Sequence, residues 1–216
     1  MLEKMGEFFE KRLSGYDAHM LTEIEGAAEF YKFTAVQLPL KPQAEILDLG
    51  CGTGLELEAY FPQNPGACVT GIDLSQGMLD ALASKFPDKH LKLICGSYFE
   101  VELGVEQYDA AVSVESLHHF TAECKLSLYR KLWRALKENG YFVLTDYFAE
   151  SDAMEKEYFA ILERLKQEQG ISDQGLYHYD TPLTVEHEMS VLKQAGFSDV
   201  RVLKHWGQTY TILAKR

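Results

Sequence analysis

Short apolar runs alternate with amphipathic stretches through the middle of the chain. The apolar runs occupy 45–50, 68–75, 91–97, 108–115 and 141–148. The stretches between them carry apolar residues at helical spacing, and the longest ends in Asn139-Gly140, a common helix stop. Alternation of this kind predicts βαβ units, and therefore an α/β fold with a parallel sheet covered by helices on both faces.

The two ends of the chain follow other patterns. Residues 2–13 and 21–38 show helical spacing, are interrupted at 14–17 and stop before the prolines that follow. After residue 148 we expect a charged helix near 152–169, then a loop, and then a helix opened by Thr184. Two strand-like runs close the chain, and the short linker around Gly207 predicts an antiparallel hairpin.

The length of 216 residues, 46% of them apolar, suits one well-buried domain. We expect four parts within it: a helical cap at 1–40, a core at 44–148, a lid or insert at 149–183, and a C-terminal helix and hairpin at 184–216.

A glycine loop follows the first strand-like run, in L-D-L-G-C-G-T-G at 47–54. Its three glycines, Gly50, Gly52 and Gly54, depart from the dinucleotide fingerprint G-x-G-x-x-G, and no Lys-Ser/Thr ending of a phosphate loop follows. Asp48 would repel a pyrophosphate and attract a cationic group. The loop therefore disfavours a nicotinamide dinucleotide and indicates a ligand with an amine.

A second carboxylate, Asp73, ends the next strand-like run, 23 positions after Gly50. That is close to the place where a carboxylate accepts hydrogen bonds from ribose hydroxyls. The structural alternative is a helix cap, a role for which Ser75 competes. The glycine loop and Asp73 together favour the ribose role.

The segments E-I-L-D-L-G-C-G-T-G, G-I-D-L-S and V-S-V-E-S-L-H-H-F resemble the class I S-adenosylmethionine-dependent methyltransferases over roughly 44–148. The resemblance implies a seven-stranded, mostly parallel Rossmann-like sheet whose last strand is antiparallel. It also implies S-adenosyl-L-methionine as cofactor and S-adenosylhomocysteine as product.

The resemblance assigns cofactor contacts to several positions. Asp48 and the loop backbone, with Cys51 and Gly54 beside Gly50 and Gly52, would hold the amino acid end of the cofactor. Asp73 would bind the ribose, and Leu74 and Met78 would pack on the adenine. Gly96 and Ser97 would border the adenine amine, although many family members carry Asp at the position of Ser97. Glu115 and Ser116 would face the methionine portion and the substrate opening.

His118 and His119 follow these positions as catalytic candidates. Adjacent residues on regular structure point apart, so we expect no metal site. Either histidine could contact the substrate or act as a base, and a structural role in the loop remains the alternative. Tyr16, in the break between the first helices, is a third candidate, because similar small-molecule methyltransferases lay such a segment over the site.

Other aromatic side chains and one loop could shape the acceptor pocket. Tyr147, Phe148, Tyr177 and Tyr179 are candidates for an aromatic lining, with packing as the alternative. The loop 171–182 is the expected lid and substrate determinant.

The net charge of −12 disfavours nucleic acid as a general partner. No apolar run approaches the ~20 residues of a membrane span, and the N-terminus lacks the pattern of a secretory signal. The four cysteines form no metal-binding spacing and indicate reduced thiols in the cytoplasm. We expect a monomer or homodimer.

The favoured function is methyl transfer to an O, N or S nucleophile of a small molecule. A tRNA-modifying enzyme of the same fold is an alternative, supported only by Arg130, Arg134 and Lys137 on one expected helical face. A non-catalytic cofactor-binding interaction protein is a third possibility, and a nicotinamide oxidoreductase a distant fourth.

Overall fold

The computed structural model describes residues 1–172 and 175–216, and over these residues seven strands form one sheet in the order β3-β2-β1-β4-β5-β7-β6. The strands are β1 Glu45–Leu49, β2 Cys68–Asp73, β3 His90–Cys95, β4 Tyr108–Val114, β5 Leu136–Tyr147, β6 Val200–Trp206 and β7 Thr209–Lys215. Strands β1 to β5 are parallel, whereas β7 runs antiparallel to both β5 and β6. The expected parallel sheet and C-terminal hairpin are confirmed.

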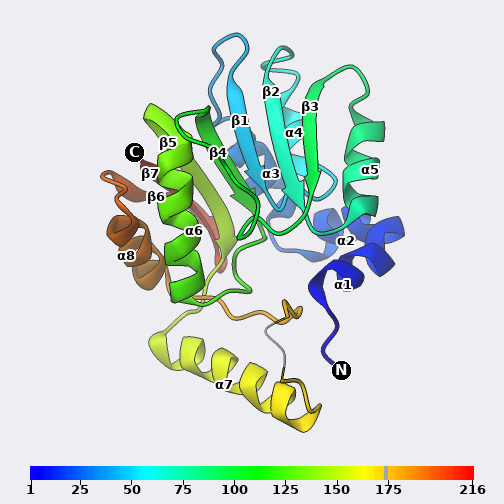
Figure 1. Cartoon of the computed structure of the whole chain (residues 1–216), viewed down its shortest axis with the longest axis vertical. Coiled ribbons are helices and arrows are strands. Elements are labelled where there is room, and N and C mark those ends of the chain that lie inside the picture. The colour runs from blue at the N-terminus through cyan, green and yellow to red at the C-terminus, as the bar shows by residue number, and fades with distance from the viewer. Residues whose placement is uncertain (173–174) are drawn as a thin grey trace.

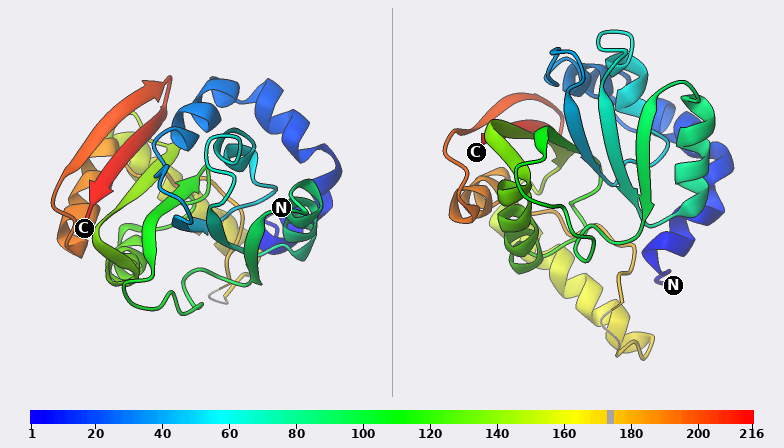
Figure 2. Two further views of the ribbon diagram at one scale, coloured as in Figure 1. Left: turned by 90° about the horizontal axis from the view of Figure 1, so that it is seen from above. Right: turned by 45° about the horizontal axis from the view of Figure 1, so that its top comes forward.

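Helices cover both faces of the sheet (Figures 1 and 2). They are α1 Met5–Arg12, a 3₁₀ turn at Leu13–Gly15, α2 Tyr16–Glu23, α3 Ala27–Ala35, α4 Leu55–Tyr60, α5 Gln76–Lys85, α6 Ala122–Ala135, α7 Asp152–Glu168 and α8 Val185–Ala195. Alternate residues of β1 enter different cores: Leu47 packs on the side of α6 and α8, and Ile46 on the side of α3 and α4. Both residues are fully buried, as the central strands of a parallel sheet require.

Two segments lie outside this layered body. Helices α1 and α2 lie beside the lower edge of the sheet in Figure 1, towards which the carboxyl ends of β1 to β3 point. Helix α7 projects away from the body below that edge, and none of its 17 residues is buried. Its start is set by Ser151, whose side chain accepts the N–H of Met154. None of the described helices is long and apolar enough to cross a membrane.

The longest expected helix ends earlier than its sequence indicates. Helix α6 stops at Ala135, and β5 begins at Leu136, which is buried and pairs with Tyr108. Pairing and burial in the sheet override the helical spacing, and Asn139 adopts a φ of 64° within the strand. Lys137 therefore does not share a helical face with Arg130 and Arg134. The expected basic helical face is wrong.

Candidate active site

The glycine loop after β1 brings the backbone close to a neighbouring strand end. Gly50 has a φ of 73°, and a Cβ placed on it would lie 2.0 Å from Ser116 Oγ. Gly52 has a φ of 48° and presents its bare backbone towards the ring of Tyr16. Only glycine fits both the left-handed conformation and the close approach at Gly50. The loop therefore exposes backbone where a ligand would meet it.

Asp73 is held by the loop rather than used as a helix cap. Its carboxylate accepts the N–H of Gly52 at 2.9 Å and the N–H of Ser75 at 2.9 Å. The capping role belongs to Ser75, whose hydroxyl accepts the N–H of Met78 at 3.1 Å. Burial raises the pKa of Asp73, and these backbone hydrogen bonds oppose that rise. The proposed contact with ribose stays a prediction, and the fold leaves this carboxylate available for it.

A small cavity of about 40 Å³ lies against the loop. Its walls are Met5, Phe9, Tyr16, Gly50, Gly52, Asp73, Met78, Glu115, Ser116 and His119. Six of the expected cofactor residues thus meet here, together with two catalytic candidates. Burial raises the pKa of Glu115 to about 8, and its carboxyl accepts the hydroxyl of Thr209 at 3.2 Å.

The other expected cofactor residues line neither this cavity nor the larger one described below. Asp48 is 1% exposed and faces Glu56. Burial is the main cause of the raised pKa of Asp48, and the neighbouring Glu56 raises it further. Cys51, Gly54, Leu74, Gly96 and Ser97 also lie outside both linings. Gly6 of α1 packs against Leu74. Their cofactor contacts stay predictions.

A much larger cavity of about 810 Å³ adjoins the small one. Helices α1 and α2 contribute Phe8, Phe9, Tyr16 and Met20 to it, β5 contributes Tyr147, and the C-terminal hairpin contributes Trp206 and Thr209. The volume lies within the range of about 300–1,000 Å³ that is typical of small-molecule sites. Of the expected aromatic residues, Tyr16 and Tyr147 line this cavity, whereas Phe148 is buried in the core.

The two cavities share one wall. Phe9, Tyr16, Glu115 and His119 line both of them. Two catalytic candidates from distant parts of the sequence therefore meet where the glycine loop opens to the large cavity. Burial and the surrounding carboxylates raise the pKa of Tyr16, so its hydroxyl keeps its proton.

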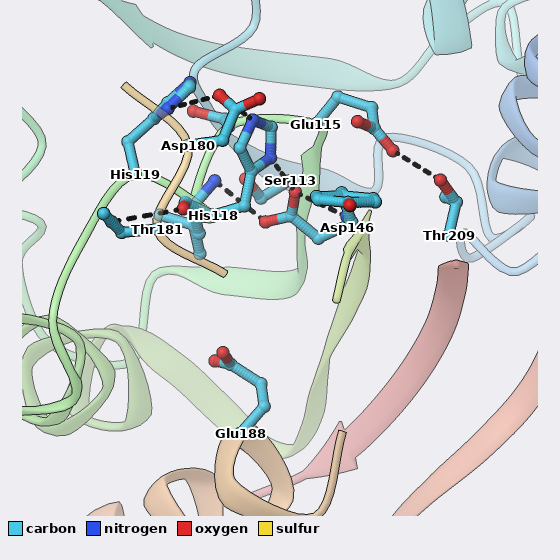
Figure 3. Close-up of polar contacts among 12 residues, drawn as sticks. Ser113, Glu115, His118, His119, Asp146, Asp180, Thr181, Glu188 and Thr209 are labelled. Atoms are coloured by element: carbon cyan, nitrogen blue, oxygen red, sulfur yellow. Dashed lines mark hydrogen bonds and ion pairs between the residues drawn. The ribbon is translucent and has the colours of Figure 1, made fainter. Parts of the chain in front are cut away.

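Two adjacent histidines and two aspartates form a group that we call the histidine cluster: His118, His119, Asp146 and Asp180 (Figure 3). His118 Nδ1 lies 2.5 Å from Asp146 Oδ1, and His118 Nε2 lies 3.5 Å from Asp180 Oδ1. His119 Nδ1 lies 3.3 Å from the same oxygen of Asp180. Asp146 is anchored in turn by the N–H groups of Leu117 and Tyr147, at 2.9 and 3.0 Å.

Burial and the neighbouring charges act in opposite directions on the pKa values of His118 and Asp180. Burial alone would lower the pKa of His118, but Asp146 and Asp180 raise it well above its ordinary value. Burial and the neighbouring His118 lower the pKa of His119. Burial would raise the pKa of Asp180, yet its contacts with both histidines lower it. The surroundings thus shift the pKa values of the two neighbouring histidines in opposite directions.

The expectation that the two imidazoles point apart is wrong. Their ring centroids are 4.1 Å apart, and both rings reach Asp180. The reason is that residues 115–121 form neither helix nor strand, and Glu115 begins this segment with a φ of 49°. The alternation rule for regular structure does not apply to such a turn.

The lid expected at 171–182 includes residues 173 and 174, which lie outside the described residues. Within the described part, the N–H of Thr181 donates to His118 O at 2.8 Å, and the N–H of His178 donates to Glu3 O at 3.0 Å. His178 and Asp180 line the large cavity, whereas the expected Tyr177 and Tyr179 do not belong to its lining. The segment thus contributes to the lining of the cavity through His178 and Asp180 rather than through the two tyrosines.

Comparison with known proteins also indicates a methyltransferase domain. Residues 46–140 match the protein family described as Methyltransferase domain. The chain is 24% identical to carboxy-S-adenosyl-L-methionine synthase of Campylobacter hominis over 225 residues, covering 100% of this chain and 96% of the relative. It is 30% identical to a malonyl acyl-carrier-protein O-methyltransferase of Priestia megaterium over 102 residues, covering 47% of this chain and 36% of that protein.

A solved structure supports the fold along almost the whole chain. A candidate O-methyltransferase of Nostoc punctiforme matches with a TM-score of 0.72 at 21% identity, covering 99% of this chain. This chain spans 62% of that one. The matched domain at 46–140, the relatives and the solved structure together support the class I S-adenosylmethionine-dependent methyltransferase family for this chain. The expected family, fold class and cofactor are confirmed.

Proposed function

We propose that this protein transfers the methyl group of S-adenosylmethionine to an O, N or S atom of a small molecule held in the large cavity. The observation that carries the proposal is the wall shared by the two cavities. An acceptor in the larger cavity would approach the glycine-loop side past Tyr16, Glu115 and His119. Methyl transfer needs the nucleophile aligned behind the methyl carbon, and a shared wall provides such a path.

The residues around the small cavity suit the cofactor in their chemistry. The Asp73 carboxylate would accept from the ribose hydroxyls, the Glu115 carboxyl would face the cationic methionine end, and Met78 would pack on the adenine. When bound, the cofactor supplies a methyl group on a sulfonium, which is a good leaving group. A cavity of about 40 Å³ is far smaller than the cofactor. Three residues of the helical cap close the small cavity: Met5, Phe9 and Tyr16. These side chains must therefore move when the cofactor binds.

The lining of the large cavity favours a neutral or cationic acceptor. Four carboxyl groups line it, from Glu23, Glu25, Glu115 and Asp180; Glu115, whose pKa is raised to about 8, is neutral near pH 7, and the other three supply negative charge. Arg12 also lines the cavity, but its guanidinium is already paired, with Nη2 lying 3.0 Å from Glu3 Oε1. An anionic acceptor would meet net repulsion in this setting. The aromatic side chains of the cap would exclude water and stack on a planar or apolar acceptor.

His119 rather than His118 is the proposed acceptor contact, because only His119 lines both cavities. His118 is a positioning residue in this scheme, held by Asp146. Tyr16 would donate its hydroxyl hydrogen to the acceptor.

The cofactor assignment is tested by calorimetric titration of the full chain with S-adenosylhomocysteine, with NADH as the control ligand. We expect binding of S-adenosylhomocysteine alone, and a loss of at least about 10-fold in affinity in Asp73→Ala. Asp88→Ala, which removes an exposed aspartate away from both cavities, is the matched control and should keep full affinity. If the wild type did not bind S-adenosylhomocysteine, the proposal would be withdrawn.

The reaction is tested by mass spectrometry after incubation with methyl-labelled cofactor and panels of small hydroxyls, amines and thiols. We expect label on a neutral or cationic acceptor, and at least about 10-fold slower transfer in His119→Gln and Tyr16→Phe. A mass change in the cofactor itself would instead support chemistry like that of the carboxy-S-adenosyl-L-methionine synthases. Label on bulk tRNA would support the tRNA alternative, and binding without any product would support a non-catalytic role.

A further inference from the structure

We propose that His118, His119 and Asp180 form a binding site for a divalent transition-metal ion of the Zn²⁺ type, at the wall of the large cavity. One ligand atom of each residue lies within 4.8 Å of the other two. Imidazole nitrogens and a carboxylate oxygen are the ligands that Zn²⁺ and Co²⁺ accept at such sites.

The distances suit an ion between the three side chains. Asp180 Oδ1 lies 3.5 Å from His118 Nε2 and 3.3 Å from His119 Nδ1, similar to the edges of a zinc tetrahedron with bonds of about 2.0–2.1 Å. One ligand atom of each residue lies within 4.8 Å of the other two, so a point between these three atoms lies at most about 2.8 Å from each. An ion could therefore reach all three ligands after small side-chain adjustments.

The imidazole of His118 has a carboxylate partner on its other ring nitrogen, as metal-ligating histidines usually do. Its Nδ1 lies 2.5 Å from Asp146 Oδ1, and with the Nδ1–H donating to this carboxylate, a neutral His118 would offer its Nε2 lone pair to an ion on the side of Asp180. Asp146 is fixed by two backbone N–H groups, from Leu117 and Tyr147. A carboxylate behind the histidine sets the tautomer and orients the ring at metal sites.

Asp180 gives the site an open side. Its side chain is 49% exposed and lines the large cavity, whereas the side chains of His118 and His119 are nearly buried. Three protein ligands with one open position are the arrangement of catalytic rather than structural zinc sites. A second group of the same kind, Glu115, His118 and Asp146, is less suitable, because Asp146 is 1% exposed and already occupied by hydrogen bonds.

The sequence alone would not place these ligands together. Backbone contacts do so: Thr181 N–H donates to His118 O at 2.8 Å, which brings Asp180 to the two histidines. His119 Nδ1 also lies 3.2 Å from Tyr179 O, a contact that ligation would replace. The role of the ion, which rests on the proposed function, would be to bind and orient an oxygen or nitrogen of the acceptor.

A different arrangement gives the same distances. An imidazolium at His118 between two carboxylates would hold the cluster by hydrogen bonds alone. The two explanations differ in one measurable property, because only a metal site binds a divalent cation at these residues.

The test is calorimetric titration of chelator-treated, full-length protein with Zn²⁺, followed by Co²⁺ titration with visible absorption. We expect one ion per chain and cobalt bands typical of nitrogen and oxygen ligands. Asp180→Asn and His119→Gln should weaken Zn²⁺ binding by at least about 10-fold. The matched control is His187→Gln, which removes a histidine paired with Glu155 at 2.7 Å, away from both cavities. It should keep Zn²⁺ affinity within about twofold.

Two results would overturn the metal site: no binding of either ion, or an equal loss of affinity in His187→Gln and Asp180→Asn. Because Asp180 is half exposed, Asp180→Asn should fold, and circular dichroism of each variant checks this. S-adenosylhomocysteine titration of the same samples separates the two proposals. Metal binding without cofactor binding would overturn the proposed function alone, and cofactor binding without metal binding would overturn this site alone.

Discussion

Two clusters of buried charge in the protein differ in their surroundings. One is the interhelix pair, in which Lys125 Nζ of α6 lies 2.5 Å from Glu188 Oε2 of α8. The hydroxyl of Tyr129 donates to the other carboxylate oxygen. The second is the histidine cluster, where His118 and Asp146 approach equally closely. Figure 3 shows Glu188 well apart from the histidine cluster.

The difference lies in access rather than in burial. Lys125 and Glu188 are 1% and 0% exposed, and neither belongs to the lining of the two cavities described above, so their direct contact holds α6 to α8. His118, His119 and Asp180 line the large cavity, and Asp180 is half exposed. A buried charge therefore indicates a functional site only when a cavity reaches it.

The largest expected effect comes from breaking the interhelix pair. Lys125→Met leaves Glu188 buried without its cation and should lower the free energy of unfolding by about 3–5 kcal/mol. Urea denaturation measures this change. In the double variant Lys125→Met/Glu188→Gln, the amide can still accept from Tyr129, so more than half of the loss should return. Folded Lys125→Met should bind S-adenosylhomocysteine like the wild type; a loss of binding would contradict the division between the two clusters.

A third buried pair, Asp48 and Glu56, sharpens the comparison through its pH dependence. Burial raises the pKa of both carboxyl groups, and Asp48 Oδ2 and Glu56 Oε1 have no hydrogen-bond partner among the described residues. The folded protein holds protons that the unfolded chain releases, so this contribution to stability is full below about pH 4 and is lost as the pH rises.

Asp48→Asn removes one of the two titrating groups. Compared with the wild type, it should raise the free energy of unfolding by about 1–3 kcal/mol at pH 7 and change it little at pH 4. Thermal melts between these pH values measure the difference. Asp88→Asn, at an exposed position, is the control and should leave the pH profile unchanged. A wild-type profile retained in Asp48→Asn would show that the pair does not titrate as described.

The sheet could be predicted from the sequence because its central strands are apolar on both faces and are separated by helical patterns. The end of α6 could not be predicted, since Leu136 suits a helix and a strand equally and only its pairing with Tyr108 decides. Thr184 and Ser75 were predictable as caps because capping depends on residues close in sequence.

The candidate site was predictable only in part, for a related reason. Asp73 and the glycine loop belong to local motifs, so their meeting follows from the βαβ unit. Asp146 ends β5, whose carboxyl end lies beside that of β4, and this position could have indicated it. Asp180 and His178 reach the cavity through long-range backbone contacts, and no local pattern signals such contacts.

The smallest expected effect on stability is at the histidine cluster. Asp180→Asn should change the free energy of unfolding by less than about 1 kcal/mol, because solvent screens the ion pairs of a half-exposed carboxylate and their loss costs little. Urea denaturation beside Lys125→Met gives the comparison directly. If Asp180→Asn cost as much as Lys125→Met, the histidine cluster would be structural, like the interhelix pair. A small cost, together with altered ligand binding, would instead mean that the cavity explains why these residues are assembled there.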